Sequence, residues 1–178
     1  MATTITNIVT MYANDEAIEK INERFDNAGG YSEMALFAKA FYDNPELIDN
    51  GVSISWSYDN LGSKWVYIEN DIDMDKWNIA SANYYPHEFL ERLFNLLTEI
   101  DPDAYVVDKY NDESNYLVGV VVLKKDDEGN PMWYNSEEYM DDPTIEMDWD
   151  EEGYDEARED FIYQMEEYQD LSLIHISE

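Results

Sequence analysis

Tyr116 to Leu123, YLVGVVVL, is an almost unbroken run of apolar residues, and it decides the class of fold. Successive side chains of a strand point to opposite faces, so a strand that is apolar at every position is covered on both faces. A second strand candidate, Ala104 to Tyr110, comes just before it, and the polar residues Asn111 to Asn115 form the turn between them. The sequence therefore predicts two strands, of which the second is buried on both sides.

Further strand-like and helix-like segments precede this pair. Thr3 to Tyr12 is rich in β-branched residues that alternate with polar ones, which predicts a strand. Amphipathic helices are predicted from Asn14, a natural N-cap, to Gly29, and from Pro86 to Asp101. A shorter helix over 32–45 and strands at 52–58, 64–69 and 77–83 complete the pattern. The order predicts an α+β domain over residues 1–125, a split βαβ arrangement with additions, with helices on one face of a mainly antiparallel sheet.

The chain is strongly acidic, with 42 Asp and Glu residues against 10 Lys and Arg residues and a net charge of −32. This equals the phosphate charge of roughly 16 base pairs of DNA. Such a field repels nucleic acid, anionic membranes and acidic substrates, and it attracts basic surfaces. The absence of cysteine excludes disulfides and thiolate metal sites. No signal peptide or membrane-length apolar run is recognisable, so we expect a cytoplasmic protein.

Residues 126–170 form a distinct acidic segment, in which 19 residues are acidic and only Arg158 is basic. We expect an appendage here that ends in a helix over 155–169. Aromatic residues interrupt the acids, and binding surfaces favour such residues as anchors. The candidate partner-binding charges are Asp141, Asp142, Glu146, Asp148, Asp150, Glu151 and Glu152, and the candidate aromatic anchors are Trp133, Trp149 and Tyr154.

The same segment contains a near-match to a calcium-binding loop. Its candidate ligands are Asp148, Asp150, Glu152 and Glu159, with Gly153 at the sharp turn. Against this reading, Asp155 replaces an expected apolar residue and no clear helix precedes the loop. Carboxylates also reach such spacings by chance in so acidic a segment, so calcium binding is the alternative rather than the leading hypothesis.

The last eight residues, 171–178 (LSLIHISE), differ abruptly from the acidic segment before them. They look like the translation of an adapter used in preparing sequencing libraries. We therefore interpret them as a non-native tail and leave them out of the prediction of the fold.

Residues 1–125 resemble a family of largely uncharacterised proteins of phages and other mobile elements. The stretch Asn60-Leu61-Gly62-Ser63-Lys64-Trp65 is similar to the family's Asn-Trp-Gly-Thr-Lys-Trp motif, with Leu61 in place of a tryptophan. A second stretch, Ala80 to Pro86, is similar to the family's Ala-Trp-x-Pro-Pro sequence. The resemblance implies a ferredoxin-like fold and a mobile-element origin, and it supplies no catalytic residues.

The sequence shows no pattern typical of an enzyme: there is no phosphate-binding glycine loop and no nucleophile with an evident base beside it. We therefore expect a binding protein and predict no catalytic residues. The leading hypothesis is a phage-type counter-defence protein, an anti-CRISPR or anti-restriction inhibitor that imitates nucleic acid. Its partner is expected to be a basic nucleic-acid-binding protein of the host bacterium, such as a CRISPR effector, nuclease or other defence complex, and neither nucleic acid nor a membrane is expected to bind directly. The alternatives are a calcium-stabilised binding module and an accessory phage protein whose acidity serves only solubility.

Overall fold

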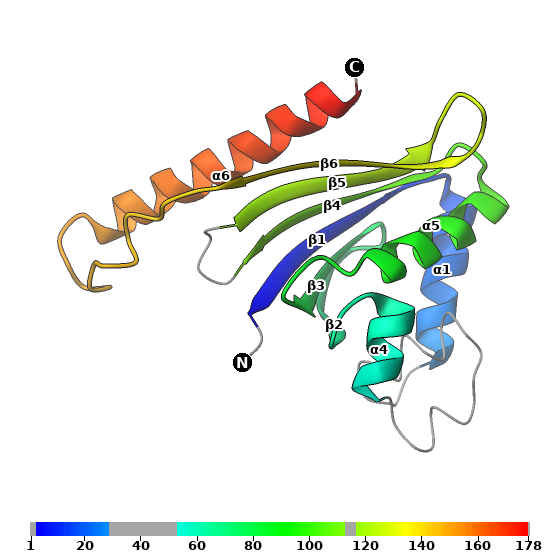
Figure 1. Ribbon diagram of the computed structural model, residues 1–178, viewed down its shortest axis with the longest axis horizontal. Helices are drawn as coiled ribbons and strands as arrows, with labels where there is room; N and C mark the ends of the chain where they lie inside the picture. Colours follow the sequence, from blue (N-terminus) through cyan, green and yellow to red (C-terminus); the bar gives the residue numbers. More distant parts are fainter. Residues whose placement is uncertain (1–2, 29–52, 113–116, 178) are drawn as a thin grey trace.

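The computed structural model describes residues 3–28, 53–112 and 117–177, and these form an α+β protein (Figure 1). A six-stranded antiparallel sheet carries four helices in this part of the chain. In chain order, the elements are β1 (Thr4–Tyr12), α1 (Asp15–Ala28), α4 (Ile54–Leu61), β2 (Val66–Asp73), β3 (Lys76–Ala82), α5 (His87–Ile100), β4 (Tyr105–Asp112), β5 (Leu117–Lys125), β6 (Pro131–Tyr139) and α6 (Tyr154–Ser177).

The strands follow the order β2-β3-β1-β4-β5-β6, and each is antiparallel to its neighbours. Strands β1 and β2 run in the same direction, and β3 lies between them. The β1–β2 connection contains α1 and α4, and the β3–β4 connection contains α5. The antiparallel sheet and the two helical connections confirm the corresponding sequence predictions.

One face of the sheet forms the main core beneath α5. Strand β1 alternates buried and partly exposed residues, with Ile5, Val9 and Met11 on the buried side. The apolar side of α5 packs on them through Phe89, Leu90, Leu93, Phe94, Leu96 and Leu97. This spacing of three and four residues places the side chains on one side of the helix. Each fully buried side chain contributes roughly 1.5–3 kcal/mol by leaving water.

The segment predicted as a strand at 52–58 contains the start of a helix instead, so that prediction is wrong. Helix α4 begins after Ser53, whose hydroxyl accepts a hydrogen bond from the Trp56 amide at 3.0 Å. It ends at Gly62, where φ is +78° and an added Cβ would lie 2.8 Å from the His87 ring. A cap at each end and the burial of Ser57 and Leu61 four residues apart favour a helix over the strand preference of the sequence VSISWSY. The short helix predicted over 32–45 lies outside the described residues.

Strand β6 and helix α6 differ from the predicted appendage. Strand β6 pairs with β5 along its length, so residues 131–139 belong to the same sheet as the preceding five strands. Helix α6 packs on the face opposite α5, where Leu173 contacts a cluster of Val107, Val120 and Val122. The one-face arrangement was predicted for the helices of residues 1–125, and α6, the predicted helix of the appendage, lies on the other face. The predicted burial of β5 on both faces is confirmed.

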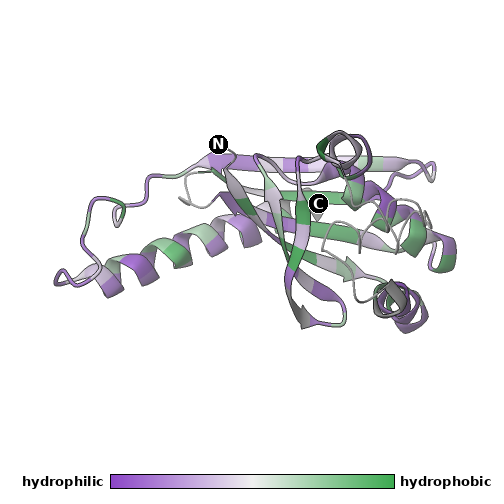
Figure 2. Cartoon of the chain, turned by 90° about the horizontal axis from the view of Figure 1, so that it is seen from below, coloured by the Kyte–Doolittle hydropathy of each residue, from purple (hydrophilic) through white to green (hydrophobic). Residues whose placement is uncertain are grey.

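The colouring by hydropathy follows this layering. Figure 2 shows apolar residues concentrated in the central strands, whereas α6 and the loop before it carry many hydrophilic residues. None of the helices in the described ranges combines the length and apolar composition that a bilayer-spanning segment requires.

Candidate partner-binding surface

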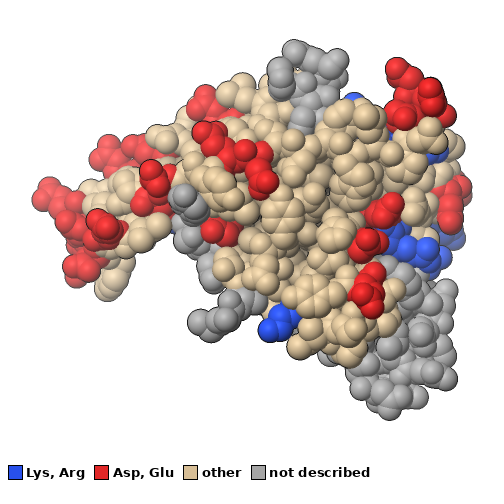
Figure 3. Space-filling model, in the orientation of Figure 1, with Lys and Arg blue, Asp and Glu red and all other residues tan. Residues whose placement is uncertain are grey.

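We call the loop 140–153 and residues 154–170 of α6 the acidic arm. The loop and the start of α6 extend beyond one end of the sheet, and the helix then runs back over the sheet (Figure 1). Acidic side chains gather at this end of the molecule in Figure 3. The C-terminal end of the arm is attached to the sheet. The Gln169 amide donates to the carbonyl oxygens of Tyr110 and Gly119, both at 3.3 Å. The Lys109 ammonium lies 2.6 Å from the Asp170 carboxylate. These contacts fix the rotation of α6 about its own axis.

The acids of α6 lie on one side of the helix. Successive residues of an α-helix are rotated by about 100°, and this places the seven acids within an arc of about 140°. All seven are exposed, and they are Asp155, Glu156, Glu159, Asp160, Glu166, Glu167 and Asp170. The opposite side of α6 contains the buried residues Phe161, Gln169 and Ser172. The arm therefore presents an acidic side on which the exposed Tyr163 lies between the acids of 155–160 and those of 166–170. The sequence prediction named none of these seven as partner-binding charges.

Six of the seven charges predicted to bind a partner are exposed in the loop: Asp141, Glu146, Asp148, Asp150, Glu151 and Glu152. Asp142 is different, because its side chain is only 3 % exposed. Its carboxylate accepts hydrogen bonds from the amide and hydroxyl of Thr144 and lies 2.6 Å from the Arg158 guanidinium. Asp142 thus anchors the loop to α6 and is not displayed to a partner. Arg158, the only basic residue of 126–170, thus pairs with an acid of the arm itself.

The three predicted aromatic anchors do not form one group. Trp149 lies in the loop and is 80 % exposed, and Tyr154 is the half-buried first residue of α6. Trp133 lies on β6, where its ring centroid is 6.4 Å from that of Tyr85. Six residues separate it from the end of β6, which corresponds to about 20 Å of strand. Trp149 and Tyr154 therefore belong to the arm, and Trp133 belongs to the sheet.

The predicted calcium ligands do not converge. Within the described ranges, no three Asp, Glu or His side chains are placed to hold a metal ion together, and this includes Asp148, Asp150, Glu152 and Glu159. The backbone forms short turns, with the Glu151 amide bonded to the Asp148 carbonyl at 2.9 Å. Gly153 has a φ of +86°, as the predicted sharp turn requires. Gly153 therefore permits the turn into α6, and the predicted carboxylate ligands are not grouped around it.

A second polar group, which the sequence did not reveal, lies where the chain enters α5. The hydroxyl of Tyr84 donates to Glu137 at 2.9 Å, and that of Tyr110 donates to Asn135 at 3.0 Å and to Glu137 at 3.4 Å. The rings of Tyr84, Tyr85 and Tyr110 lie 4.4–5.8 Å apart. We call these five residues the tyrosine cluster. Its sequence signal is the Tyr84-Tyr85 pair, but its partners come from β4 and β6.

Burial determines the ionisation of this region. It raises the pKa of Tyr85 to about 12, and the charges of Tyr84, Glu137 and Asp108 act in the same direction. The pKa of Tyr110 is also raised, first by burial and then by its hydrogen bond with Tyr84. The tyrosines are therefore neutral hydrogen-bond donors at pH 7, and they hold the Glu137 carboxylate in place.

Asp108 on β4 is the least expected residue of the core. It is completely buried, and neither of its carboxyl oxygens has a hydrogen-bond partner in the structure. Its neighbours across the two adjacent strands are Val9 and Val121. Desolvation raises the pKa of this carboxyl well above its ordinary value. Asn7, which is two residues from Val9 on β1, also has a buried side-chain oxygen without a hydrogen-bond partner.

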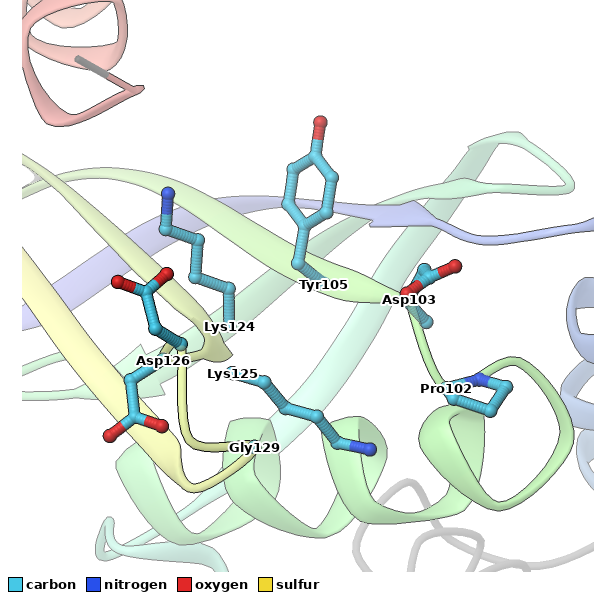
Figure 4. A pocket seen from close by; sticks show the side chains of 9 residues that line it. Pro102, Asp103, Tyr105, Lys124, Lys125, Asp126 and Gly129 are labelled. Carbon is cyan, nitrogen blue, oxygen red and sulfur yellow. The ribbon is translucent and has the colours of Figure 1, made fainter.

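A hollow of about 400 Å³ lies at the end of the sheet where β4 begins and β5 ends (Figure 4). Lys124 and Lys125 line it and point in different directions, and Asp103 and Asp126 lie around them. The Lys124 ammonium is 5.1 Å from the centre of the Tyr134 ring. The mixture of charges gives this hollow no clear preference for an anion or a cation.

Comparison with protein families, curated proteins and solved structures found no match for the chain.

Proposed function

We propose that the protein is a stoichiometric inhibitor that uses the acidic arm to occupy the nucleic-acid channel of a basic bacterial protein. In this proposal it is a phage-type counter-defence protein, of the anti-CRISPR or anti-restriction kind, and it acts in the cytoplasm of the host. The observation that carries the proposal is the acidic side of an anchored helix, α6, which has seven exposed carboxylates: Asp170, which pairs with Lys109, and six others.

The charge density of this face supports imitation of nucleic acid. Asp155 and Asp170 are separated by fifteen residues, or about 22 Å of helix at 1.5 Å per residue. The six intervals between the seven charges average about 3.7 Å, near the spacing of about 3.4 Å along one DNA strand. The acids form two groups, 155–160 and 166–170, which lie about 9 Å apart along the helix. The exposed acids of the loop 140–153 continue the array. A basic channel that binds phosphates would gain similar electrostatic energy from this surface.

The anchoring of the arm argues for binding rather than solubility alone. An array that is already ordered loses less conformational entropy on binding than a mobile tail. Here Phe161 is buried, Gln169 bonds to two strands, and Asp142 and Arg158 hold the loop on the helix. A solubilising segment would gain nothing from these contacts.

We further propose that residues 1–125 follow the ferredoxin-like plan with β5 as an addition. The order β2-β3-β1-β4 and the two helical connections support this assignment. The acidic arm is then carried by the additions to that plan, because β5, β6 and α6 come after its last strand.

A displacement assay tests the proposed inhibition. Fluorescent DNA is bound at 50 mM salt to a guide-loaded CRISPR effector nuclease and, separately, to a type I and a type II restriction endonuclease, and the protein is titrated in. We expect one of the three to release its DNA at a one-to-one ratio, because the arm and the DNA compete for the same channel. The apparent affinity should fall steeply as salt rises to 300 mM.

Two outcomes would contradict the proposal. If none of the three complexes releases DNA, the proposed inhibition is wrong, and acidity that serves only solubility becomes the better explanation. If release requires calcium, the calcium-stabilised module replaces it.

A further inference from the structure

Strand β6 is one of the two edge strands of the sheet, and within the described part of the chain no strand pairs with its outer side. Seven of its nine residues are exposed. Proline stands only at its first position, so the remaining residues keep their amide groups. About half of the backbone groups of an edge strand point away from the sheet and can pair with another chain.

The two faces of β6 differ in chemistry. Tyr134 and Ser136 point toward α6, where Ser136 and Tyr168 share a hydrogen bond of 2.9 Å. The opposite face presents Trp133, Asn135, Glu137 and Tyr139, which alternate along the strand. Trp133 is 37 % exposed and Tyr139 is 64 % exposed. This face therefore offers an exposed aromatic ring at each end, with polar groups between them.

The Glu137 carboxylate on this face is already held in position by hydrogen bonds. The hydroxyls of Tyr84 and Tyr110 hold its carboxylate at 2.9 and 3.4 Å. A carboxylate has about four acceptor sites, so the two tyrosines leave room for a cation. A guanidinium group pairs with such a carboxylate through two parallel hydrogen bonds.

The charge of the chain determines which strand can pair with this edge. A second copy would bring another net charge of −32, and it would add its own Glu137 and Glu138 to this edge. Like charges that face each other across strands are destabilising. With an extended segment rich in Arg or Lys, the charges that face each other across the strands attract instead of repelling.

We propose that β6 binds an extended basic segment of the partner protein, which adds a seventh strand to the sheet. An arginine of this segment lies opposite Glu137, within reach of the Tyr139 ring on the same face. Backbone hydrogen bonds along β6 supply affinity, and the Glu137 position supplies specificity. This inference rests on the proposed function, since it assumes a basic protein partner.

A labelled peptide of five alternating Arg-Thr pairs is the probe, and fluorescence anisotropy at 50 mM salt measures its binding. The control peptide has the same sequence with every backbone amide N-methylated, which keeps the charge and removes the donors. We expect the control to bind about tenfold more weakly, because several backbone hydrogen bonds are lost. Amide hydrogen exchange should slow at residues 131–139 when the unmodified peptide binds.

Two protein variants test the register. Glu137→Gln should weaken binding of the unmodified peptide about threefold, as expected for one partly exposed charge pair. Glu138→Gln removes the same charge from the adjacent residue, whose side chain lies on the other face. It should change the affinity by less than about half of the effect of Glu137→Gln.

Equal binding of the two peptides, equal effects of the two variants, or no binding of either peptide would overturn strand addition. The DNA displacement assay decides the proposed inhibition separately. If DNA is displaced while the two peptides bind equally, the acidic arm acts by charge alone and the β6 proposal fails.

Discussion

Asp108 allows a quantitative prediction about stability and pH. Its carboxyl is completely buried between Val9 and Val121, without a hydrogen-bond partner, and its pKa is raised by desolvation. The unfolded chain releases this proton near pH 3.9, whereas the folded chain retains it to a higher pH. Between the two pKa values, the folded state binds one more proton than the unfolded state. The free energy of unfolding therefore falls as pH rises, by about 1.4 kcal/mol per pH unit from this group alone.

Asp108→Asn removes the titration and keeps the shape of the side chain. We expect wild type and variant to have similar stability near pH 4, and we expect the variant to be more stable by about 1.4 kcal/mol for each pH unit above that. The difference should stop growing once pH exceeds the pKa of Asp108 in the folded protein. Urea unfolding followed by tryptophan fluorescence at half-unit steps from pH 4 to pH 8 measures both curves.

The matched control is Asp103→Asn, which removes one exposed acid near the start of β4. It corrects for the general relief of repulsion in a chain of net charge −32. Parallel stability curves for Asp108→Asn and Asp103→Asn between pH 4 and pH 8 would show that Asp108 does not retain its proton in the folded protein above pH 4.

Three further substitutions test the packing. Gly119→Ala should lower stability by about 1–3 kcal/mol, because the new Cβ would lie 2.2 Å from the Tyr110 ring; an unchanged urea midpoint would contradict the close approach. Arg158→Met should lower the free energy of unfolding by about 1–3 kcal/mol, since it leaves the buried Asp142 carboxylate without its cation. Proteolysis within 140–153 should also become faster. Unchanged cleavage would show that the ion pair does not hold the loop. Ser53→Ala should cost about 1 kcal/mol through loss of the α4 cap, and a thermal midpoint equal to that of wild type would argue against this cap.

Sequence patterns predicted the elements that have strong local signals. The apolar spacing of α5, the Asn14 cap of α1 and the alternation of β1 all agree with the structure. The prediction failed at 52–58, where the capping residues Ser53 and Gly62 determine a helix in a sequence with strand-like composition.

Strand β6 could not be predicted from its sequence, because pairing with β5 holds it in place and few of its own side chains are buried. The candidate site was predicted in part. The acidic segment and Trp149 were recognised from composition, but the exclusion of Asp142 depends on Arg158, sixteen residues away. The tyrosine cluster joins residues from the α5 entry, β4 and β6, so no local pattern reveals it.

In the proposed mechanism, the acidic side of α6 competes with nucleic acid for a basic channel. The most direct test neutralises six of its acids in one variant, leaving Asp170 paired with Lys109: Asp155→Asn, Glu156→Gln, Glu159→Gln, Asp160→Asn, Glu166→Gln and Glu167→Gln. A matched variant neutralises six exposed acids elsewhere: Glu19→Gln, Glu23→Gln, Glu99→Gln, Asp103→Asn, Asp127→Asn and Glu128→Gln.

The measurement is the concentration of each variant that releases half of the bound DNA in the displacement assay. We expect the α6 variant to need at least about a hundredfold more protein, since six charge contacts worth several tenths of a kcal/mol each are lost. The matched variant should remain within about fivefold of wild type, because its charges lie outside the proposed contact. Equal loss in both variants would show that net charge alone is responsible and would contradict competition through α6.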